Sequence, residues 1–191
     1  MSVKQTIQAR RAYRSLEPVE INEELIRDLA ESARLAPSCF NNQPWRFVFA
    51  HDPEVLKKLH GAMSKGNEWT QAASMIIAVF SREDLDCRIK GRNYYLFDTG
   101  MATAFIILRA TELGLVAHPI AGYNEDAVKE ILGVPEDMQV IALVIVGEHS
   151  ETLGPLLTEK QAESEKQRPE RLPLEEFAFI NVMSNEAISK T

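Results

Sequence analysis

The chain has 191 residues, of which 45% are hydrophobic and 26% charged, and its formal net charge is -7. This charge disfavours general nucleic-acid binding, which depends on Lys and Arg neutralising phosphates. The chain has no run of about 18 apolar residues, so we expect no contact with a membrane. The N-terminal residues lack the apolar segment of a secretory signal, and the only cysteines, Cys39 and Cys87, are too few for a disulfide framework. We therefore expect a cytoplasmic protein in a reducing compartment.

Helical and strand patterns alternate along the first 147 residues. A short helix is predicted over 2–11 and an amphipathic one over 22–35, for which Asn22 is a suitable N-cap. The remaining predicted elements are a strand at 46–50, a helix starting at Asp52 and Pro53, a strand at 74–80, a largely apolar helix at 94–113 closed by Gly114, a helix from Asn124 to Gly133 and a strand at 140–147. The last strand is apolar throughout, which is typical of a central strand buried on both faces. We expect helices to cover the sheet.

The composition changes after Gly147. A polar, charged stretch is followed by the apolar segment LPLEEFAFINVM at 172–183. Such a tail can pack back on its own chain or reach a partner subunit, and the long polar connection allows both. We favour the partner. The prediction is a single domain over 1–191, with 150–191 a C-terminal extension on the partner subunit.

Three arginines lie close together in QARRAYRSLEP at 8–18: Arg10, Arg11 and Arg14. Guanidinium groups suit a phosphate because their geometry allows two parallel charge-assisted hydrogen bonds. Taken alone, such a pattern is more often the solvated end of a helix.

An amide-rich loop, APSCFNNQPW at 36–45, follows the predicted amphipathic helix. Asn41, Asn42 and Gln43 offer paired donors and acceptors that could bind a planar heterocycle. The alternative is that these amides cap the helix and satisfy their own loop, while Trp45 belongs to the core.

Taken together, these motifs resemble those of the nitroreductase family of FMN-dependent oxidoreductases, which has an R-R-S-x-R segment followed by A-P-S-x-x-N-x-Q-P-W. Further segments are similar to the family's central helix, flavin-contacting turn and C-terminal motif: FDTGMATAFIILRATELGL, HPIAGYNEDAVKEILGVPED and RLPLEEF. The resemblance implies an α+β, nitroreductase-like fold, with a central mixed, mainly antiparallel sheet flanked by helices. It also implies an interlocked homodimer with FMN at the interface.

The resemblance implies a first set of FMN contacts at the arginine cluster. Arg10 and Arg11 match residues that hold the FMN phosphate and ribityl end, and Ala12 stands where the family usually has serine. Arg14 matches a basic residue near the flavin pyrimidine, where positive charge supports the reduced flavin. Arg171 would complete the phosphate site, with Arg168 as a helper.

A second set lies on loops farther along the chain. Ser38, Cys39 and Asn41 match the loop that reaches FMN from the other subunit, and Gln43, Pro44 and Trp45 resemble its structural anchor. Asn67 is similar to an asparagine at the pyrimidine edge, although a simple turn role is nearly as good an interpretation. Ile120, Ala121 and Gly122 match a turn whose backbone N–H groups approach the flavin, and Gly122 would permit that approach.

The resemblance implies catalysis by the cofactor itself. NADH or NADPH would act as a transient donor, passing hydride to FMN, and a nitroaromatic, quinone or similar small-molecule acceptor would follow in a ping-pong cycle. No catalytic side chain or metal is required. Segment 81–95 is the expected place of substrate selection.

Other functions remain open. One is a non-catalytic FMN storage or sensor protein, and another is a different flavin reaction of the same family, such as reductive dehalogenation. A thiol enzyme with Cys39 as nucleophile is disfavoured because nothing in the sequence pairs that cysteine with a histidine.

Overall fold

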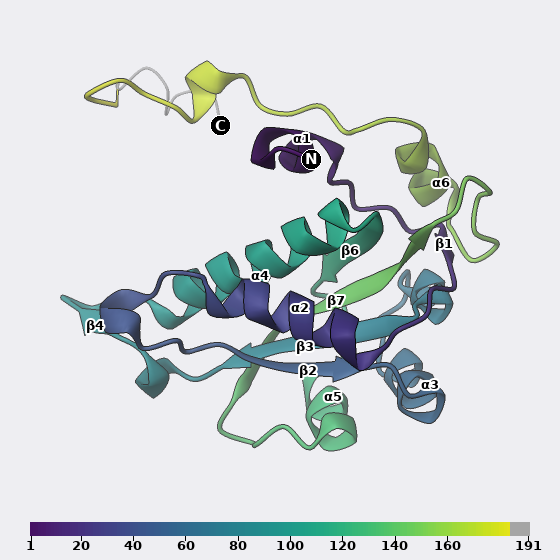
Figure 1. Cartoon of the computed structure of the whole chain (residues 1–191), viewed down its shortest axis with the longest axis horizontal. Coiled ribbons are helices and arrows are strands. Elements are labelled where there is room, and N and C mark those ends of the chain that lie inside the picture. The colour runs from purple at the N-terminus through teal and green to yellow at the C-terminus, as the bar shows by residue number, and fades with distance from the viewer. Residues whose placement is uncertain (184–191) are drawn as a thin grey trace.

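The computed structural model describes residues 1–183, and a five-stranded sheet forms its centre (Figure 1). The strand order is β1-β7-β3-β2, and β6 also pairs with β7. The strands are β1 Leu16–Glu17, β2 Arg46–Ala50, β3 Met75–Ser81, β6 Leu115–Ile120 and β7 Gln139–His149. All of these pairings are antiparallel. The mainly antiparallel sheet that the family resemblance implied is thereby confirmed, although no parallel pair that would make it mixed occurs within residues 1–183.

The central strand β7 lies between β3 and β6. Ile77 of β3 is opposite Val144, and Ala117 of β6 is opposite Val146. All residues of β3 are buried, which agrees with its continuous apolar sequence. The strands predicted at 46–50, 74–80 and 140–147 are confirmed, whereas β6 was missed because Pro119 lies within it and disfavours a strand.

Helices cover both faces of the sheet, and because the sheet is antiparallel rather than built from parallel βαβ units, the fold is α+β. The six helices in residues 1–183 are α1 Val3–Ala9, α2 Glu23–Arg34, α3 Pro53–Gly61, α4 Tyr95–Glu112, α5 Glu125–Leu132 and α6 Glu159–Lys166. Alternate residues of β3 separate two cores. Ile76 packs with Leu59 of α3 and Val128 of α5, while Ile77 packs with residues of α2 and α4. The predicted helix starts hold, since the side chains of Asn22, Asp52 and Asn124 each accept a backbone N–H of the first turn.

Helix α4 buries one side and exposes the other. Ala102, Ile106 and Ala110 are fully buried against the sheet, whereas Phe97 is 64% exposed. Helix α1, packed on α4, adds two more exposed apolar side chains, Val3 and Ile7. We call this surface the apolar face; it consists of Val3, Ile7, Leu96, Phe97 and Phe105. Among the described helices, none has the length and apolar character needed to cross a membrane.

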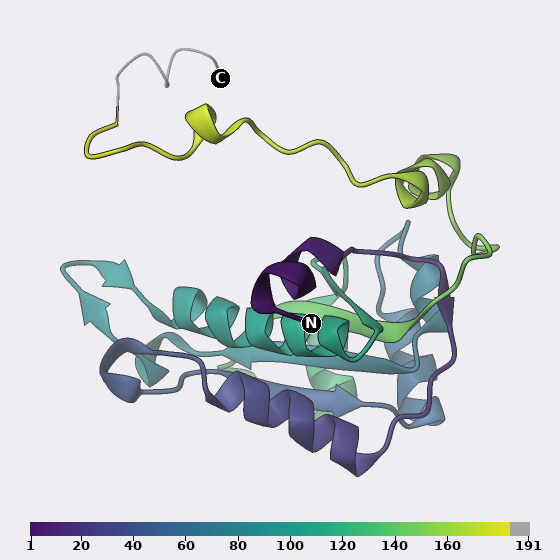
Figure 2. The ribbon, with the colours of Figure 1, turned by 45° about the horizontal axis from the view of Figure 1, so that its top comes forward.

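The chain beyond β7 forms helix α6, which contacts the body of the molecule, and then leaves that body. Helix α6 was not predicted, because it is polar on every side and buries no residue; its start is fixed by a capping box at Thr158. An extended tail follows, and side chains from 169 to 183 are exposed. Figure 2 shows the tail running apart from the sheet and from α1. The last eight residues of the predicted extension 150–191 lie outside the described residues.

Candidate functional site

A cationic pocket of about 260 Å³ lies between the segment after α1 and the segment that includes α6. We call it the arginine pocket; its lining residues are Arg10, Arg11, Ala12, Arg14, Ser164, Arg168, Pro169 and Arg171. All residues that the sequence assigned to the phosphate end of the site therefore meet here, although the chain separates Arg168 and Arg171 from the N-terminal arginines by more than 150 positions. Ser164 and Pro169 were missed, because the polar sequence around them gives no sign of a packed helix.

Helix α6 fixes the arginine segment through its last turn. The Glu165 carboxylate accepts the backbone N–H groups of Arg14 and Ser15, at 3.0 and 3.1 Å. In return, the Arg11 guanidinium donates to the carbonyl oxygens of Ser164 and Glu165, at 3.3 and 3.2 Å. A cation at carbonyl groups near a helix C-terminus is favourable for both the hydrogen bonds and the helix dipole. The arginine segment is thus held in an extended conformation with its side chains around one pocket.

Like charges accumulate in this pocket. Burial lowers the pKa of Arg10, and the neighbouring guanidinium groups of Arg168, Arg171 and Arg11 lower that pKa further. Within residues 1–183, none of the pocket's arginines forms an ion pair with a carboxylate. A bound phosphate would relieve this repulsion, because it supplies negative charge and several acceptor oxygens. The pocket therefore fits a phosphorylated ligand.

The turn at Ile120–Gly122 is tied to Asn67. The Asn67 side-chain amide donates to the carbonyl oxygen of Gly122, at 2.8 Å, and a Cβ at position 122 would lie only 2.5 Å from the Asn67 nitrogen. A side chain at position 122 would therefore displace the Asn67 amide and break this hydrogen bond. The Gln161 side chain of α6 donates to the carbonyl oxygen of Gly66, at 2.7 Å, so α6 links this turn to the arginine pocket. Asn67 has a clear structural task in this arrangement, and its sequence-derived role as a ligand contact stays a prediction.

The amide-rich loop lies elsewhere in the molecule. It follows α2 and reaches the end of the sheet opposite to α6, as both views of the ribbon show (Figures 1 and 2). Three of its non-glycine residues have left-handed backbone conformations: Phe40, Asn41 and Gln43, with φ of 49°, 59° and 50°. A single chain therefore does not bring Ser38, Cys39 and Asn41 to the arginine pocket.

Three contacts, two hydrogen bonds and a disulfide, define the conformation of this loop. The Ser38 hydroxyl accepts the backbone N–H of Gln43 at 3.0 Å. The backbone N–H of Cys39 donates to the Asp98 carboxylate at 2.6 Å. Trp45, which follows the loop, is buried in the core beside α2 and α4, as its predicted role as an anchor requires.

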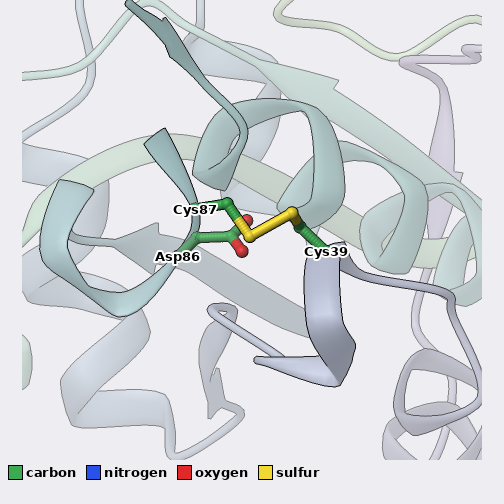
Figure 3. Close-up of side chains that lie close together, drawn as sticks. All are labelled: Cys39, Asp86 and Cys87. Carbon is green, nitrogen blue, oxygen red and sulfur yellow. A yellow bond between two sulfur atoms is a disulfide. The ribbon is translucent and has the colours of Figure 1, made fainter. Parts of the chain in front are cut away.

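The third contact is a disulfide between Cys39 and Cys87 (Figure 3). No such bond was expected from the sequence, because two cysteines 48 positions apart show no spacing pattern. The bond forms because the chain after β3 turns back toward the amide-rich loop and places the two Cα atoms 6.0 Å apart. This bond corrects the expectation, drawn from the cysteine count, that both cysteines stay reduced. It also leaves Cys39 without a free thiol to act as the nucleophile of a thiol enzyme, a function that the sequence had already disfavoured. Any contact that Cys39 makes with a ligand comes from its backbone or from the disulfide.

The protein is α+β, with a mainly antiparallel sheet between helical layers. Its candidate binding residues are divided between a cationic pocket at one end of the sheet and an amide-rich loop at the other. The chain belongs to the Nitroreductase family, whose family model matches residues 7–74 and 62–148. The family and the fold that the sequence motifs resembled are thereby confirmed.

Individual relatives agree with this assignment. The chain is 31% identical to the Archaeoglobus fulgidus protein named "Putative NADH dehydrogenase/NAD(P)H nitroreductase", over 74% of this chain and 82% of that protein. It is 28% identical to the iodotyrosine deiodinase of Haliscomenobacter hydrossis, over 72% of this chain and 75% of the relative. A crystal structure described as an oxidoreductase containing FMN superposes with a TM-score of 0.81 at 28% identity, covering 94% of this chain and 91% of that one.

Proposed function

We propose that this protein is an FMN-dependent oxidoreductase that takes hydride from NADH or NADPH and passes electrons to a small acceptor such as a nitroaromatic or a quinone. The observation that carries the proposal is the arginine pocket, in which residues from both ends of the chain surround a space suited to a phosphate. Family membership and the names of the relatives support the same reaction class.

The residues of the arginine pocket have separate tasks in this proposal. Arg10, Arg11 and Arg171 hold the phosphate with charge-assisted hydrogen bonds. Arg14 supplies positive charge at the pyrimidine edge; its guanidinium is positioned by the Ser164 hydroxyl at 3.3 Å and by the Trp69 ring. Bound FMN supplies the two-electron chemistry, and the chain supplies position and charge.

The turn at Ile120–Gly122 forms a second wall. Because Gly122 has no side chain, backbone groups of this turn can lie directly against a planar ring. Asn67 holds the turn in place through its hydrogen bond to the Gly122 carbonyl.

The site is completed by a second copy of the chain. The apolar face and the exposed tail, with Leu174, Phe177 and Ile180, present more hydrophobic side chains to solvent than a monomer is expected to carry. In a homodimer, the apolar faces pack together, the exposed tail at 172–183 lies on the partner, and the amide-rich loop of one subunit approaches the arginine pocket of the other. The dimer therefore accounts for the separation of the two sets of binding residues.

Reductive dehalogenation is a second candidate, because one relative is an iodotyrosine deiodinase. Both candidates need reduced FMN and differ in the acceptor. Anaerobic incubation of the reduced protein with iodotyrosine, followed by measurement of iodide, distinguishes them from each other.

The proposal is tested by adding FMN, removing the unbound flavin, and recording absorbance spectra before and after anaerobic addition of NADH or NADPH. Retained flavin that bleaches with either nucleotide, and recovers its colour when a quinone is added, is the expected result. Flavin that stays bound and never bleaches would mean a storage or sensor protein. A protein that retains no flavin would overturn the site assignment.

A further inference from the structure

The Cys39–Cys87 disulfide joins two segments of different character. Cys39 belongs to the amide-rich loop, and Cys87 lies at the base of the hairpin formed by β4 Arg88–Ile89 and β5 Arg92–Asn93. In a single subunit, both cysteine residues are partly exposed rather than sealed in the core. The disulfide thus cross-links, near the surface of the subunit, the amide-rich loop and segment 81–95, where substrate selection was predicted.

Polar groups surround the sulfur atoms. A carboxylate oxygen of Asp86 lies within 4.8 Å of both sulfurs (Figure 3). The Asn42 side-chain amide donates to the Cys87 sulfur at 3.5 Å and to the Asp86 carboxylate at 3.3 Å. Such a donor would stabilise a thiolate on Cys87 more than one on Cys39, since it contacts only the Cys87 sulfur. Cys87 is therefore the better leaving group.

A carboxyl pair lies beside the disulfide. Asp98 is only 2% exposed, and burial raises its pKa; the adjacent Asp86 carboxyl raises that pKa as well. One oxygen of Asp86, Oδ2, is buried and has no hydrogen-bond partner among residues 1–183. A proton held between Asp86 and Asp98 gives that oxygen a partner and removes the repulsion between two carboxylates. The pair can therefore act as an acid next to the Cys87 sulfur.

We propose that Cys39–Cys87 is a reversible thiol–disulfide site, reduced by a dithiol, in which the Asp86–Asp98 pair protonates the departing Cys87 thiolate. The reductant belongs to the class of small dithiols or dithiol proteins, and the oxidant that restores the bond belongs to the class of small disulfides. Neither step requires FMN.

The reaction consists of two thiol–disulfide exchanges. A thiolate of the reductant attacks the Cys39 sulfur; a bond forms between these two sulfurs, the Cys39–Cys87 bond breaks, and Cys87 leaves as a thiolate that takes the shared proton. The second thiolate of the reductant then attacks the reductant sulfur of this mixed disulfide and releases Cys39, which takes a proton from water. The protein gains two electrons and two thiols, and the dithiol becomes a disulfide.

Reduction removes one restraint from a loop with unfavourable backbone conformations. Phe40 and Gln43 have positive φ, which costs energy in non-glycine residues and persists only where surrounding contacts enforce it. After reduction, only the hydrogen bonds to the Ser38 hydroxyl and to the Asp98 carboxylate still restrain the loop. We therefore expect a weaker FMN complex in the reduced protein, and this consequence rests on the proposed function.

The first experiment measures thiols directly in the full-length protein. The protein is equilibrated in glutathione buffers of different redox poise, trapped with iodoacetamide and weighed by mass spectrometry. We expect two alkylated cysteines in reducing buffer and none in oxidising buffer, with full interconversion. Two free thiols in oxidising buffer, or a bond that resists reduction in the folded protein, would overturn the proposal.

The second experiment tests the acid. The rate of reduction by dithiothreitol is compared between wild type and Asp98→Asn, with Asp126→Asn on the exposed side of α5 as the control. A proton donor predicts a rate at pH 7 about tenfold lower in Asp98→Asn and unchanged in the control. If Asp98 only held the loop, its loss would expose the disulfide and increase the rate, which would contradict the proposed role. If Asp98→Asn fails to fold, Asp86→Asn replaces it as the test, and we expect this variant to slow the reduction by a similar factor.

The third experiment concerns the loop. FMN affinity is measured for oxidised and reduced wild type and for Cys87→Ser, which cannot form the bond. The reduced protein and Cys87→Ser should bind FMN about three- to tenfold more weakly than the oxidised protein, and the variant should not respond to dithiothreitol. Equal FMN affinity of the oxidised protein, the reduced protein and Cys87→Ser would show that the disulfide has no effect on FMN binding. If no form bound FMN, the proposed function would fail, while the thiol and rate measurements would still decide the exchange reaction.

Discussion

The two ends of the molecule hold their candidate binding residues in different ways. At the arginine end, one chain brings together residues from its N-terminal and C-terminal parts, and α6 fixes them with hydrogen bonds from Glu165, Ser164 and Gln161. At the other end, the amide-rich loop is held by a disulfide and a buried carboxylate and has no part of the arginine pocket near it. The arginine pocket is thus built within one subunit, whereas the amide-rich loop can contribute to the proposed site only beside another subunit, as in the proposed homodimer.

Replacing Arg10 with alanine should have the largest effect on the arginine end. Burial and the neighbouring guanidinium groups both lower the pKa of Arg10 in the pocket, so an anionic ligand beside this side chain would relieve an unfavourable charge. Loss of a charge-assisted hydrogen bond is worth about 1.5 to 3 kcal/mol, or a roughly 10- to 150-fold weaker FMN complex. Isothermal titration calorimetry measures the change.

The matched control for this variant is Arg27→Ala. Arg27 is exposed on α2 and forms an ion pair with Glu23 at 3.6 Å, away from the pocket. FMN affinity should be unchanged in the control. Equal affinities of Arg10→Ala and wild type would mean that the arginine end is a solvated basic surface and that the comparison of two half-sites is wrong.

The arginine end could be predicted from the sequence in part. Arg10, Arg11 and Arg14 lie within five positions, so their closeness in the structure is a local property of the sequence. Strands β3 and β7 could likewise be predicted, because each contains a continuous apolar run. Helix α6 could not be predicted, because its stability comes from Glu165 and Gln161 bonding to residues about 95 to 150 positions away. The disulfide depends likewise on how the chain folds back after β3, which no local pattern encodes.

A second prediction concerns the pH dependence of stability at the arginine end. His118 of β6 is buried beside Trp69, and its Nδ1 lies 3.0 Å from the Tyr13 carbonyl oxygen. Burial lowers the pKa of His118 to about 4, with the Arg14 charge acting in the same direction. The unfolded chain binds a proton near pH 6.5, so the stability that neutral His118 provides is lost as the pH falls from about 6.5 to 4. At pH 5 the loss is about 2 kcal/mol.

This effect is measured by urea unfolding of wild type and His118→Gln at pH 7 and pH 5. Wild type should lose about 2 kcal/mol more than the variant between these values. The other end of the molecule acts with the opposite sign, because burial raises the pKa of Asp98 and its contribution is lost as the pH rises above the usual carboxyl range. Parallel pH profiles of wild type and His118→Gln would contradict the assignment of acid sensitivity to the arginine end.

The smallest expected effect concerns the proposed dimer, in which the arginine pocket of one subunit lies beside the amide-rich loop of the other. Ile7 is 53% exposed on α1, within the apolar face, so Ile7→Asp should leave the folded subunit intact. Burying the new carboxylate in a dimer interface would cost at least about 1.4 kcal/mol, which is a tenfold higher dissociation constant for the dimer. Gln8→Asp adds the same charge at the next, exposed position and is the control. Sedimentation velocity measures the dimer, and FMN titration of the same samples measures the site. A monomeric Ile7→Asp that binds FMN as tightly as wild type would show that one chain suffices, and that the amide-rich loop has no part in holding the flavin.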